Sequence, residues 1–400
     1  MRVTFLILFF LTTALFSQTE TKIPTWKEDN VLLYDTMFQK EILTKNTARQ
    51  GFLLDEENIE RRLSQLNKLT PMNLVYNTSV LQNIKFYLLQ RKEQVGKLLA
   101  LSEYYYPIFE EYLDKNNLPL ELKHLPVIES SLNPNARSYA GAVGLWQFMY
   151  PTAKEYGLRI NSYLDERKDI YKSTQAACDY LIKAYKVFND WDLALSSYNA
   201  GRGNITKAIR RSGGKLNYWE LRPFLPKQTS NYIPAFIAAV YVMTFAEEHG
   251  IYPDTNYLFK SHQIDSVYLQ RPMKIAHLSK LLSIDSILLA ELNPVYRNKL
   301  VPSLDTERFS IALPENKVGL FIMNEESIYK QAEEMEREEQ TKYPEFTDIE
   351  KIRYRVKSGD YLGKIAKKYK CTIKDIMLWN DLKSHSIKVG QRLNIYKNVN

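Results

Sequence analysis

Apolar residues spaced three and four positions apart dominate the first half of the 400-residue chain. This spacing runs through residues 84–101 and continues to Asn116 and Asn117, and it is typical of amphipathic helices. Few segments alternate with a period of two, so the pattern does not favour long strands. We therefore expect a mainly α protein, with an all-α domain over residues 83–250.

Three further segments extend this helical pattern toward residue 250. Residues 173–188 predict a helix with Ser173 as its N-cap, and residues 190–201 predict one that ends at Gly201. The segment 230–250 is nearly all apolar and closes with a glycine, which predicts a helix inside the core.

The C-terminal segment 352–397 has a different, compact pattern. A short strand precedes the turn at Ser358, Gly359 and Asp360, and a second strand follows Gly390. Two helical segments lie between them, and Thr372 with Asp375 has the spacing of a capping box at the start of the second. We expect a small α+β module of βααβ order.

Regions with weaker patterns separate these two domains and precede the first. Residues 255–315 are interrupted by prolines, yet 275–296 repeats the order of apolar positions and Asn seen in 365–381, which predicts a degenerate copy of the C-terminal module. Residues 316–350 are rich in Glu and are expected to form a charged linker. Residues 18–82 have no sustained period and are expected to be an N-terminal extension.

The first seventeen residues have the layout of a secretory signal peptide. Arg2 is followed by an apolar run from 3 to 16 and by the small residue Ser17. The run is too short to span a bilayer comfortably, and no later segment is long and apolar enough to do so. We expect export to the periplasm and no integral membrane span.

Composition and short motifs exclude several functional classes. The net charge of +8 suits an anionic partner, but no basic run accompanies it, and with the export signal this disfavours nucleic acid. The two cysteines lie far apart, and the chain lacks HExxH, CxxC and Ser-x-x-Lys motifs. We expect no metal and no cofactor.

Glu129 is the candidate catalytic residue. On a helix starting near Pro119 it falls on a stripe with Leu122, Leu125 and Leu132, and an apolar environment raises the pKa of a carboxyl group. A carboxyl group with a raised pKa is suited to act as a general acid in glycosidic cleavage. Spacing alone leaves an alternative open, in which a kink at Pro126 exposes Glu129 to solvent.

Three downstream segments carry amides and tyrosines near glycines. They are 140–149 with Gln147, 193–201 with Tyr198 and Asn199, and 229–236 with Tyr232. Such groups are suited to bind sugar hydroxyls and acetamido groups.

Taken in order, the motifs Glu129-Ser130, GLWQ (144–147), YNAG (198–201) and NYIPAF (231–236) resemble the soluble-lytic-transglycosylase-like domain of the lytic murein transglycosylase D family. The C-terminal segment resembles a LysM domain. Small departures are Ser197, where Ala is usual, and Tyr361, where Thr is usual. The resemblance implies a lysozyme-like all-α catalytic domain followed by a LysM module.

The resemblance also implies a reaction. Glu129 would protonate the β-1,4 glycosidic oxygen between N-acetylmuramic acid and N-acetylglucosamine, and the muramoyl C6 hydroxyl would then attack C1 to leave a 1,6-anhydromuramoyl end. The implied substrate-binding residues are Ser130, Gln147, Tyr198, Asn199 and Tyr232, and those binding glycan in the LysM module are Ser358, Gly359, Asp360, Tyr361 and Asn380. By the same resemblance, Ser130 would help to position Glu129, and Tyr232 would also hydrogen-bond its carboxyl group. The partner would be peptidoglycan glycan strands, bound by a monomer associated with the cell wall.

Two alternatives remain. The same fold could act as a lysozyme-type muramidase that admits water, or the chain could be a non-catalytic peptidoglycan-binding protein. Ordinary glycosidases use two carboxylates. Asp165, Glu166, Asp190 and Asp192 are the candidates for a second one, although their contexts favour helix caps and ion pairs.

Overall fold

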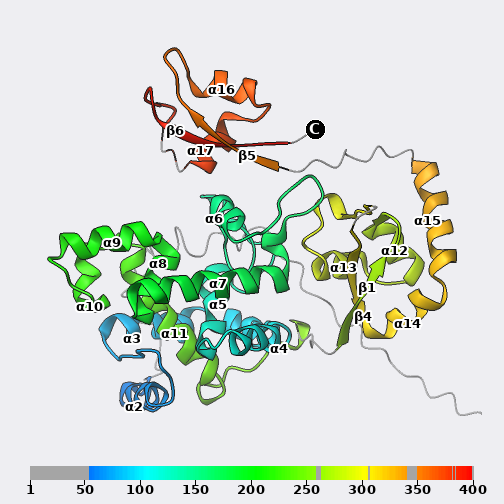
Figure 1. Cartoon of the computed structure of the whole chain (residues 1–400). Helices are drawn as coiled ribbons and strands as arrows, with labels where there is room; N and C mark the ends of the chain where they lie inside the picture. The colour runs from blue at the N-terminus through cyan, green and yellow to red at the C-terminus, as the bar shows by residue number, and fades with distance from the viewer. Residues whose placement is uncertain are drawn as a thin grey trace, which may run out of the picture.

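The computed structural model describes residues 54–257, 263–304, 307–339, 349–380, 382 and 384–398. The expected signal peptide, residues 1–17, lies outside them. The described part is mainly helical, as predicted, and contains no helix with the length and apolarity needed to cross a bilayer. Figure 1 shows a large helical domain, a second module beside it, and the C-terminal module on the side of α6 (Tyr150–Glu155).

The helical domain is built around α11 (Tyr232–Thr244), in which the residues from Tyr232 to Val242 are all buried. This confirms the predicted core helix, although it ends at Thr244, and Gly250 instead closes a short 3₁₀ turn at Glu247–His249. Helices packed against or around α11 are α3 (Thr78–Lys85), α4 (Lys92–Lys115), α5 (Leu125–Ser130), α7 (Ile170–Phe188), α8 (Trp191–Ala200), α9 (Arg202–Arg211) and α10 (Tyr218–Leu221).

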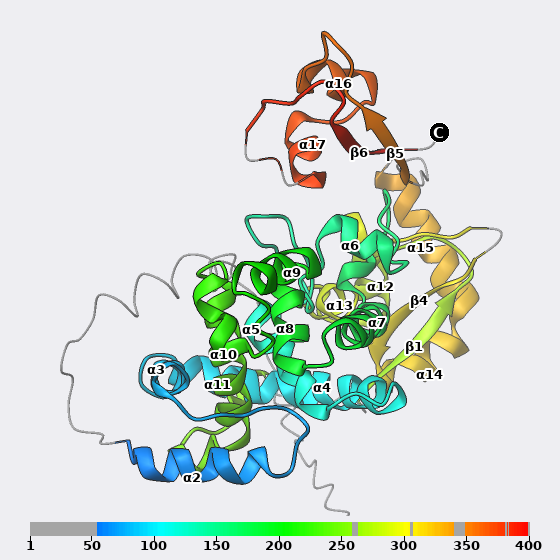
Figure 2. The ribbon, with the colours of Figure 1, turned by 60° about the vertical axis from the view of Figure 1, so that its left-hand side comes forward.

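The described part of the expected N-terminal extension belongs to this core. Helix α2 (Glu56–Asn67) places Ile59 and Leu63, four positions apart, in the interior, and α3 packs on α11. Figure 2 shows α2 and α3 lying along the domain. The prediction of a separate extension over 18–82 is therefore corrected for residues 54–82.

Two helix starts differ from the predictions. The pattern over 84–101 is interrupted by a π-helical turn at Phe86–Gln90, after which α4 begins at Lys92 and ends, as predicted, at Asn116. Helix α7 begins at Ile170 and not at Ser173, because the Asp169 carboxylate caps it by accepting from the backbone N–H groups of residues 171 and 172. Helix α8 ends at Gly201 as predicted.

The second module has βααβ order followed by two helices. Its antiparallel strands are β1 (Ile264–Leu269) and β4 (Phe309–Pro314), with short strands β2 (Met273–Lys274) and β3 (Leu300–Val301) and helices α12 (Ile275–Leu282), α13 (Ser286–Leu292), α14 (Glu315–Met323) and α15 (Glu325–Glu339).

Helices α14 and α15 correct the predicted linker over 316–350 for residues 316–339. Residues Ile328, Tyr329 and Ala332 of α15, at helical spacing, are buried against the second module, and α14 contributes Phe321 to the same core. The Glu-rich face of α15 forms ion pairs with Arg271 and Lys274. The Glu-rich composition alone predicts a solvated segment. Burial of one apolar stripe instead packs α15 against the second module.

The C-terminal module repeats the βααβ order with β5 (Ile349–Arg355), α16 (Leu362–Lys368), α17 (Ile373–Trp379) and β6 (Arg392–Asn398). The predicted capping box of Thr372 and Asp375 is confirmed.

The two βααβ modules share one detailed feature. At the end of the second helix, Asn380 donates to the carbonyl oxygen of residue 394 at 2.8 Å and accepts from the backbone N–H of the same residue at 2.6 Å. Asn293 does the same with the backbone of Ala312, at 2.9 and 2.8 Å. An asparagine therefore joins the second helix to the last strand in both modules.

Candidate active site

Glu129 lies in the last turn of α5. The predicted continuous helix from Pro119 is instead a 3₁₀ helix at Leu120–His124 followed by α5, and Ser131 and Leu132 then adopt left-handed backbone conformations with φ of 53° and 58°. Pro126 sits in the first turn of α5, where its missing N–H is tolerated, so it does not kink the helix, and Glu129 is half-buried.

Tyr232 donates a hydrogen bond from its hydroxyl to the Glu129 carboxyl group. This tyrosine is the first residue of α11 and is fully buried. The preceding residue, Asn231, exchanges side-chain amide hydrogen bonds of 3.2 and 3.3 Å with Asn83 of α3. Helix α3 thereby holds the end of α11 from which Tyr232 reaches Glu129.

Burial raises the pKa of Glu129 from 4.5 to about 7, while the hydrogen bond from Tyr232 acts in the opposite direction. No charged group in the described part of the chain contributes to this shift. The carboxyl group is therefore protonated in much of the population at neutral pH, which is the state that a general acid needs.

Ser130 connects α5 to the GLWQ loop. Its hydroxyl donates to the carbonyl oxygens of Leu145 and Pro126 at 2.8 and 3.0 Å. Gln147, with a φ of 49°, donates its amide to the carbonyl of Gly144 at 2.8 Å. The Gln147 side-chain oxygen has no hydrogen-bond partner among the described residues and remains available to a ligand.

Gly144 is required at its position in this loop. Its φ is +90°, and a Cβ atom there would lie 1.9 Å from the carbonyl oxygen of Arg167. Only glycine combines this backbone conformation with so close an approach. The loop that receives Ser130 is therefore packed directly on residues 165–169.

Tyr198 and Asn199, at the end of α8, complete the cluster. The Tyr198 hydroxyl donates to the carbonyl oxygen of Trp146 at 2.7 Å. Burial raises the pKa of Tyr198, and the charge of Glu129 adds to this shift. Asn199 accepts from the Thr229 hydroxyl at 2.9 Å. The Asn199 amide nitrogen has no partner among the described residues.

The six residues predicted from the catalytic-domain motifs are thus linked by one set of contacts from four segments. Sequence reasoning missed three of the supporting residues, Thr229, Asn83 and Asn231. Thr229 and Asn83 are almost fully buried and polar, but a single sequence offers no signal that pairs them with residues far along the chain.

The candidate second carboxylates are engaged elsewhere. Asp165 pairs with Arg167 at 2.7 Å, and Glu166 pairs with Arg159 at 2.7 Å. Asp190 caps α8. Burial and the charge of Asp190 raise the pKa of Asp192 to about 7, but Asp192 receives a hydrogen bond from Asn73 and lies seven residues, about 10 Å of helix, before Asn199.

The predicted LysM residues divide into two groups. Asp360 accepts from the Tyr354 hydroxyl at 2.6 Å and from the Lys357 backbone N–H at 2.8 Å, and Asn380 is engaged with β6, so these two side chains hold the module together. Ser358, Gly359 and Tyr361 are exposed on the surface, the last to 64%.

One cluster has the residue types of a metal site. His277, Glu336 and Glu339 bring possible ligand atoms within 4.8 Å of one another. However, the Lys274 ammonium group lies 3.2 Å from Glu336 and 2.5 Å from Glu339. An ammonium group of the protein itself therefore already pairs with both carboxylates of this cluster.

Comparison with known families matches three parts of the chain. The profile of the "Transglycosylase SLT domain" matches residues 107–220, that of the "LysM domain" matches 354–395, and that of the "Lytic transglycosylase MltD, LysM-like domain" matches 263–330. The last match overlaps the segment expected from sequence to be a degenerate copy.

Individual relatives agree with these matches. The membrane-bound lytic murein transglycosylase D of Escherichia coli K12 is 28% identical over 322 residues, which cover 77% of this chain and 66% of that protein, just under two thirds of its length. A putative tributyltin chloride resistance protein of Alteromonas sp. is 38% identical over 115 residues, covering 28% and 55%.

Among solved structures, the 70 kDa soluble lytic transglycosylase of Escherichia coli aligns with a TM-score of 0.32 and 18% identity, over 50% of this chain and 34% of that one. The domain assignments do not depend on this alignment. The chain carries an SLT transglycosylase domain, an MltD-type LysM-like domain and a LysM domain, and it is homologous to the membrane-bound lytic murein transglycosylase D of Escherichia coli.

Proposed function

We propose that this protein cleaves the β-1,4 bond between N-acetylmuramic acid and N-acetylglucosamine in peptidoglycan and forms 1,6-anhydromuramoyl ends. The observation that carries the proposal is the Glu129 carboxyl group. Its pKa is raised by burial, it is held by Tyr232, and it has no charged neighbour in the described part of the chain. A lone carboxyl group of this kind favours a mechanism without a second carboxylate over the two-carboxylate mechanisms of ordinary glycosidases.

Glu129 acts first as acid and then as base. The protonated carboxyl group transfers its proton to the glycosidic oxygen, and the bond from that oxygen to the muramoyl C1 breaks. The resulting carboxylate takes the proton of the muramoyl C6 hydroxyl as the C6 oxygen bonds to C1. Glu129 is then protonated again, and no water is consumed.

Surrounding residues orient the carboxyl group and the sugars. Tyr232 fixes one carboxyl oxygen, and Ser130 fixes the end of α5 against the GLWQ loop. The side-chain oxygen of Gln147 and the amide nitrogen of Asn199 provide an acceptor and a donor for sugar hydroxyl and acetamido groups. Tyr198 supports this arrangement through its hydrogen bond to residue 146.

The C-terminal LysM module binds the glycan of the wall and keeps the catalytic domain near its substrate. Ser358, Gly359 and Tyr361 form the exposed part of the module that is available for this contact. Cleavage of peptidoglycan takes place in the periplasm after export of the protein, and the active form is a monomer.

Product analysis tests the reaction. Purified peptidoglycan is digested with the protein, and the soluble fragments are analysed by mass spectrometry. We expect anhydromuramoyl ends, which are lighter by one water than free reducing ends. Free reducing ends would establish the lysozyme-type alternative, and an absence of released fragments would favour the non-catalytic one.

The pH profile tests the state of Glu129. Because its protonated form is the acid, kcat/KM should fall as the pH rises through about 7. Tyr232→Phe removes a hydrogen bond that lowers the Glu129 pKa, so the alkaline limb should move to higher pH, while the rate falls roughly tenfold or more from poorer orientation.

Tyr241→Phe is the matched control for that variant. Tyr241 is a buried tyrosine on the same helix whose hydroxyl contacts His249 and not Glu129. Its removal should leave the alkaline limb in place. A Tyr232→Phe profile with an unmoved limb would contradict the assigned hydrogen bond.

A further inference from the structure

The SLT domain and the LysM-like module are joined through backbone hydrogen bonds. The N–H of Asp165 donates to the carbonyl of Val295 at 2.9 Å, and the N–H of Arg297 donates to the carbonyl of Tyr163 at 2.7 Å. The Arg297 guanidinium also donates to the carbonyl of Asn161 at 2.7 Å. Residues 161–169 and 293–297 thus form a fixed junction.

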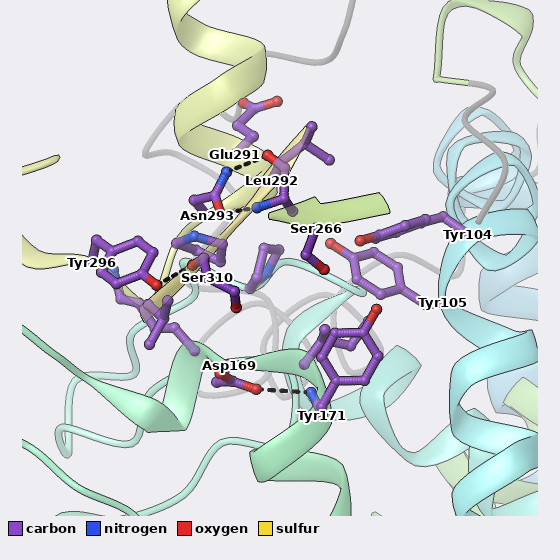
Figure 3. Close-up of a pocket in the computed structure, with 16 residues that line it drawn as sticks. Tyr104, Tyr105, Asp169, Tyr171, Ser266, Glu291, Leu292, Asn293, Tyr296 and Ser310 are labelled. Carbon is purple, nitrogen blue, oxygen red and sulfur yellow. Dashed lines mark hydrogen bonds between the residues drawn. The ribbon is translucent and has the colours of Figure 1, made fainter. Parts of the chain in front are cut away.

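Beside this junction lies a cavity of about 90 Å³, which we call the junction cavity. Figure 3 shows Tyr104, Tyr105 and Tyr171 of the SLT domain on one side and Tyr296 and Ser310 of the LysM-like module on the other. Its lining therefore comes from both units and exists only when they are joined.

Several polar groups of the cavity have no protein partner. The Tyr105 side chain is only 7% exposed, and its hydroxyl makes no hydrogen bond within the described part of the chain but is not fully buried, so it is open to the cavity. Tyr171 and Ser266 are exposed, and their hydroxyls likewise lack a partner among the described residues. These three hydroxyls can therefore bind water or a ligand that enters the cavity.

Two charged residues of the lining, Lys168 and Asp169, already form hydrogen bonds within the protein. Lys168 donates to the side-chain oxygen of Asn135 at 2.9 Å, and Asp169 caps α7 through the backbone N–H groups of residues 171 and 172. Burial raises the pKa of Tyr105 and of Tyr171, and the negative charges of Glu291 and Asp169 respectively add to these shifts, although Glu291 extends away from the tyrosines in Figure 3. Neutral hydroxyls set among carboxylates disfavour an anionic ligand and suit a neutral polar one.

The volume of the junction cavity indicates which part of a sugar can enter it. The cavity of about 90 Å³ has room for several water molecules or an acetamido group and is open to solvent on one side. A sugar ring at this open side would lie against the exposed Tyr171 while its acetamido group entered.

We propose that the junction cavity is a glycan-binding site, separate from the Glu129 cluster, that accepts the acetamido group of an N-acetylated sugar. The choice of ligand rests on the proposed action on peptidoglycan. Tyr105 and Tyr171 donate to the acetamido and ring oxygens, and the methyl group lies against the tyrosine rings.

The test uses the full chain carrying Glu129→Gln, so that no substrate is consumed and the outcome does not depend on catalysis. Tyrosine rings are labelled with ¹³C, and the signals of Tyr105 and Tyr171 are assigned from Tyr→Phe variants. The protein is titrated with N,N′-diacetylchitobiose and, as the matched ligand, with cellobiose, which has the same linkage but no acetamido groups.

We expect the Tyr105 and Tyr171 signals to shift saturably with N,N′-diacetylchitobiose and to remain unchanged with cellobiose. Shifts confined to other tyrosines would overturn the site, and equal shifts with cellobiose would overturn the acetamido assignment. Either result leaves the product analysis of the wild-type protein unaffected, so the two proposals fail separately.

Variants test the individual contacts. Tyr105→Phe removes one hydroxyl, so the affinity for N,N′-diacetylchitobiose should fall by roughly fivefold. The Tyr171 signal reports this affinity in the variant. Ser266→Leu, on an exposed strand position, should fill the mouth and abolish the Tyr171 shift. Tyr252→Phe, an exposed tyrosine outside the cavity, is the control and should change nothing. Full affinity in both Tyr105→Phe and Ser266→Leu would contradict the proposal.

Discussion

Glu129→Gln is expected to reduce glycan cleavage by roughly a thousandfold or more while stabilising the folded protein above pH 7. Glutamine preserves the shape of the side chain and can still accept a hydrogen bond from Tyr232. It has no proton to give to the glycosidic oxygen and cannot take one from the C6 hydroxyl. Both proposed steps lose their only acid–base group.

The stability gain follows from the raised pKa. A carboxyl group with a pKa near 4.5 when unfolded and about 7 when folded is neutral in both states below pH 4.5 and costs nothing there. The cost of ionising it in the folded protein grows between pH 4.5 and 7 and is constant above. It amounts to about 3 kcal/mol, which the glutamine variant does not bear.

Urea unfolding at pH 5 and pH 8 measures this difference. The free energy of unfolding of Glu129→Gln should exceed that of the wild type by more at pH 8 than at pH 5. Glu103→Gln, an exposed position on α4, should show no such dependence. A Glu129→Gln protein that still releases fragments would disprove the catalytic assignment, and one without a pH-dependent gain would disprove the raised pKa.

Gly144→Ala should destabilise the protein by about 3 kcal/mol or more. The φ of +90° strains any residue with a Cβ, and that atom would meet the carbonyl oxygen of Arg167 at 1.9 Å, so backbone must move. Because the adjacent Leu145 receives the Ser130 hydroxyl, we also expect a large loss of cleavage.

Thermal unfolding is a suitable measurement for this variant, and a drop in Tm of roughly 6–12 °C corresponds to that energy. Gly203→Ala is the control, since Gly203 lies within α9, a Cβ atom there would meet no described atom within 4 Å, and the position should tolerate or favour alanine. Equal Tm values for the two variants would show that the loop relaxes without cost.

The sequence correctly predicted those elements whose signals lie close together in the chain. The apolar run of α11, the end of α8 at Gly201 and the capping box of the C-terminal module all follow from residues close together in the chain. The charged composition around α15 concealed an apolar stripe, because Ile328, Tyr329 and Ala332 are few among many glutamates. The helical spacing of these three residues, considered apart from the composition, would have predicted that α15 packs against the second module.

Local sequence patterns predicted only part of the candidate site. Helical spacing correctly associated Glu129 with buried leucines, but the chain reaches that result through a 3₁₀ helix, a short α-helix and two left-handed residues. The hydrogen bond from Tyr232 was suggested by family resemblance and not by spacing. The junction between residues 161–169 and 293–297 had no sequence signal, since backbone hydrogen bonds impose no residue type.

The contact between Tyr232 and Glu129 joins residues 103 positions apart. The residues of α11 from Tyr232 to Val242 are buried by the rest of the domain, so the pair depends on packing of this helix against its neighbours. An incompletely folded chain lacks both the enclosed carboxyl group and its tyrosine. The proposed acid–base role of Glu129 therefore requires a folded catalytic domain, since the side chain acquires its surroundings only from residues far away in the chain.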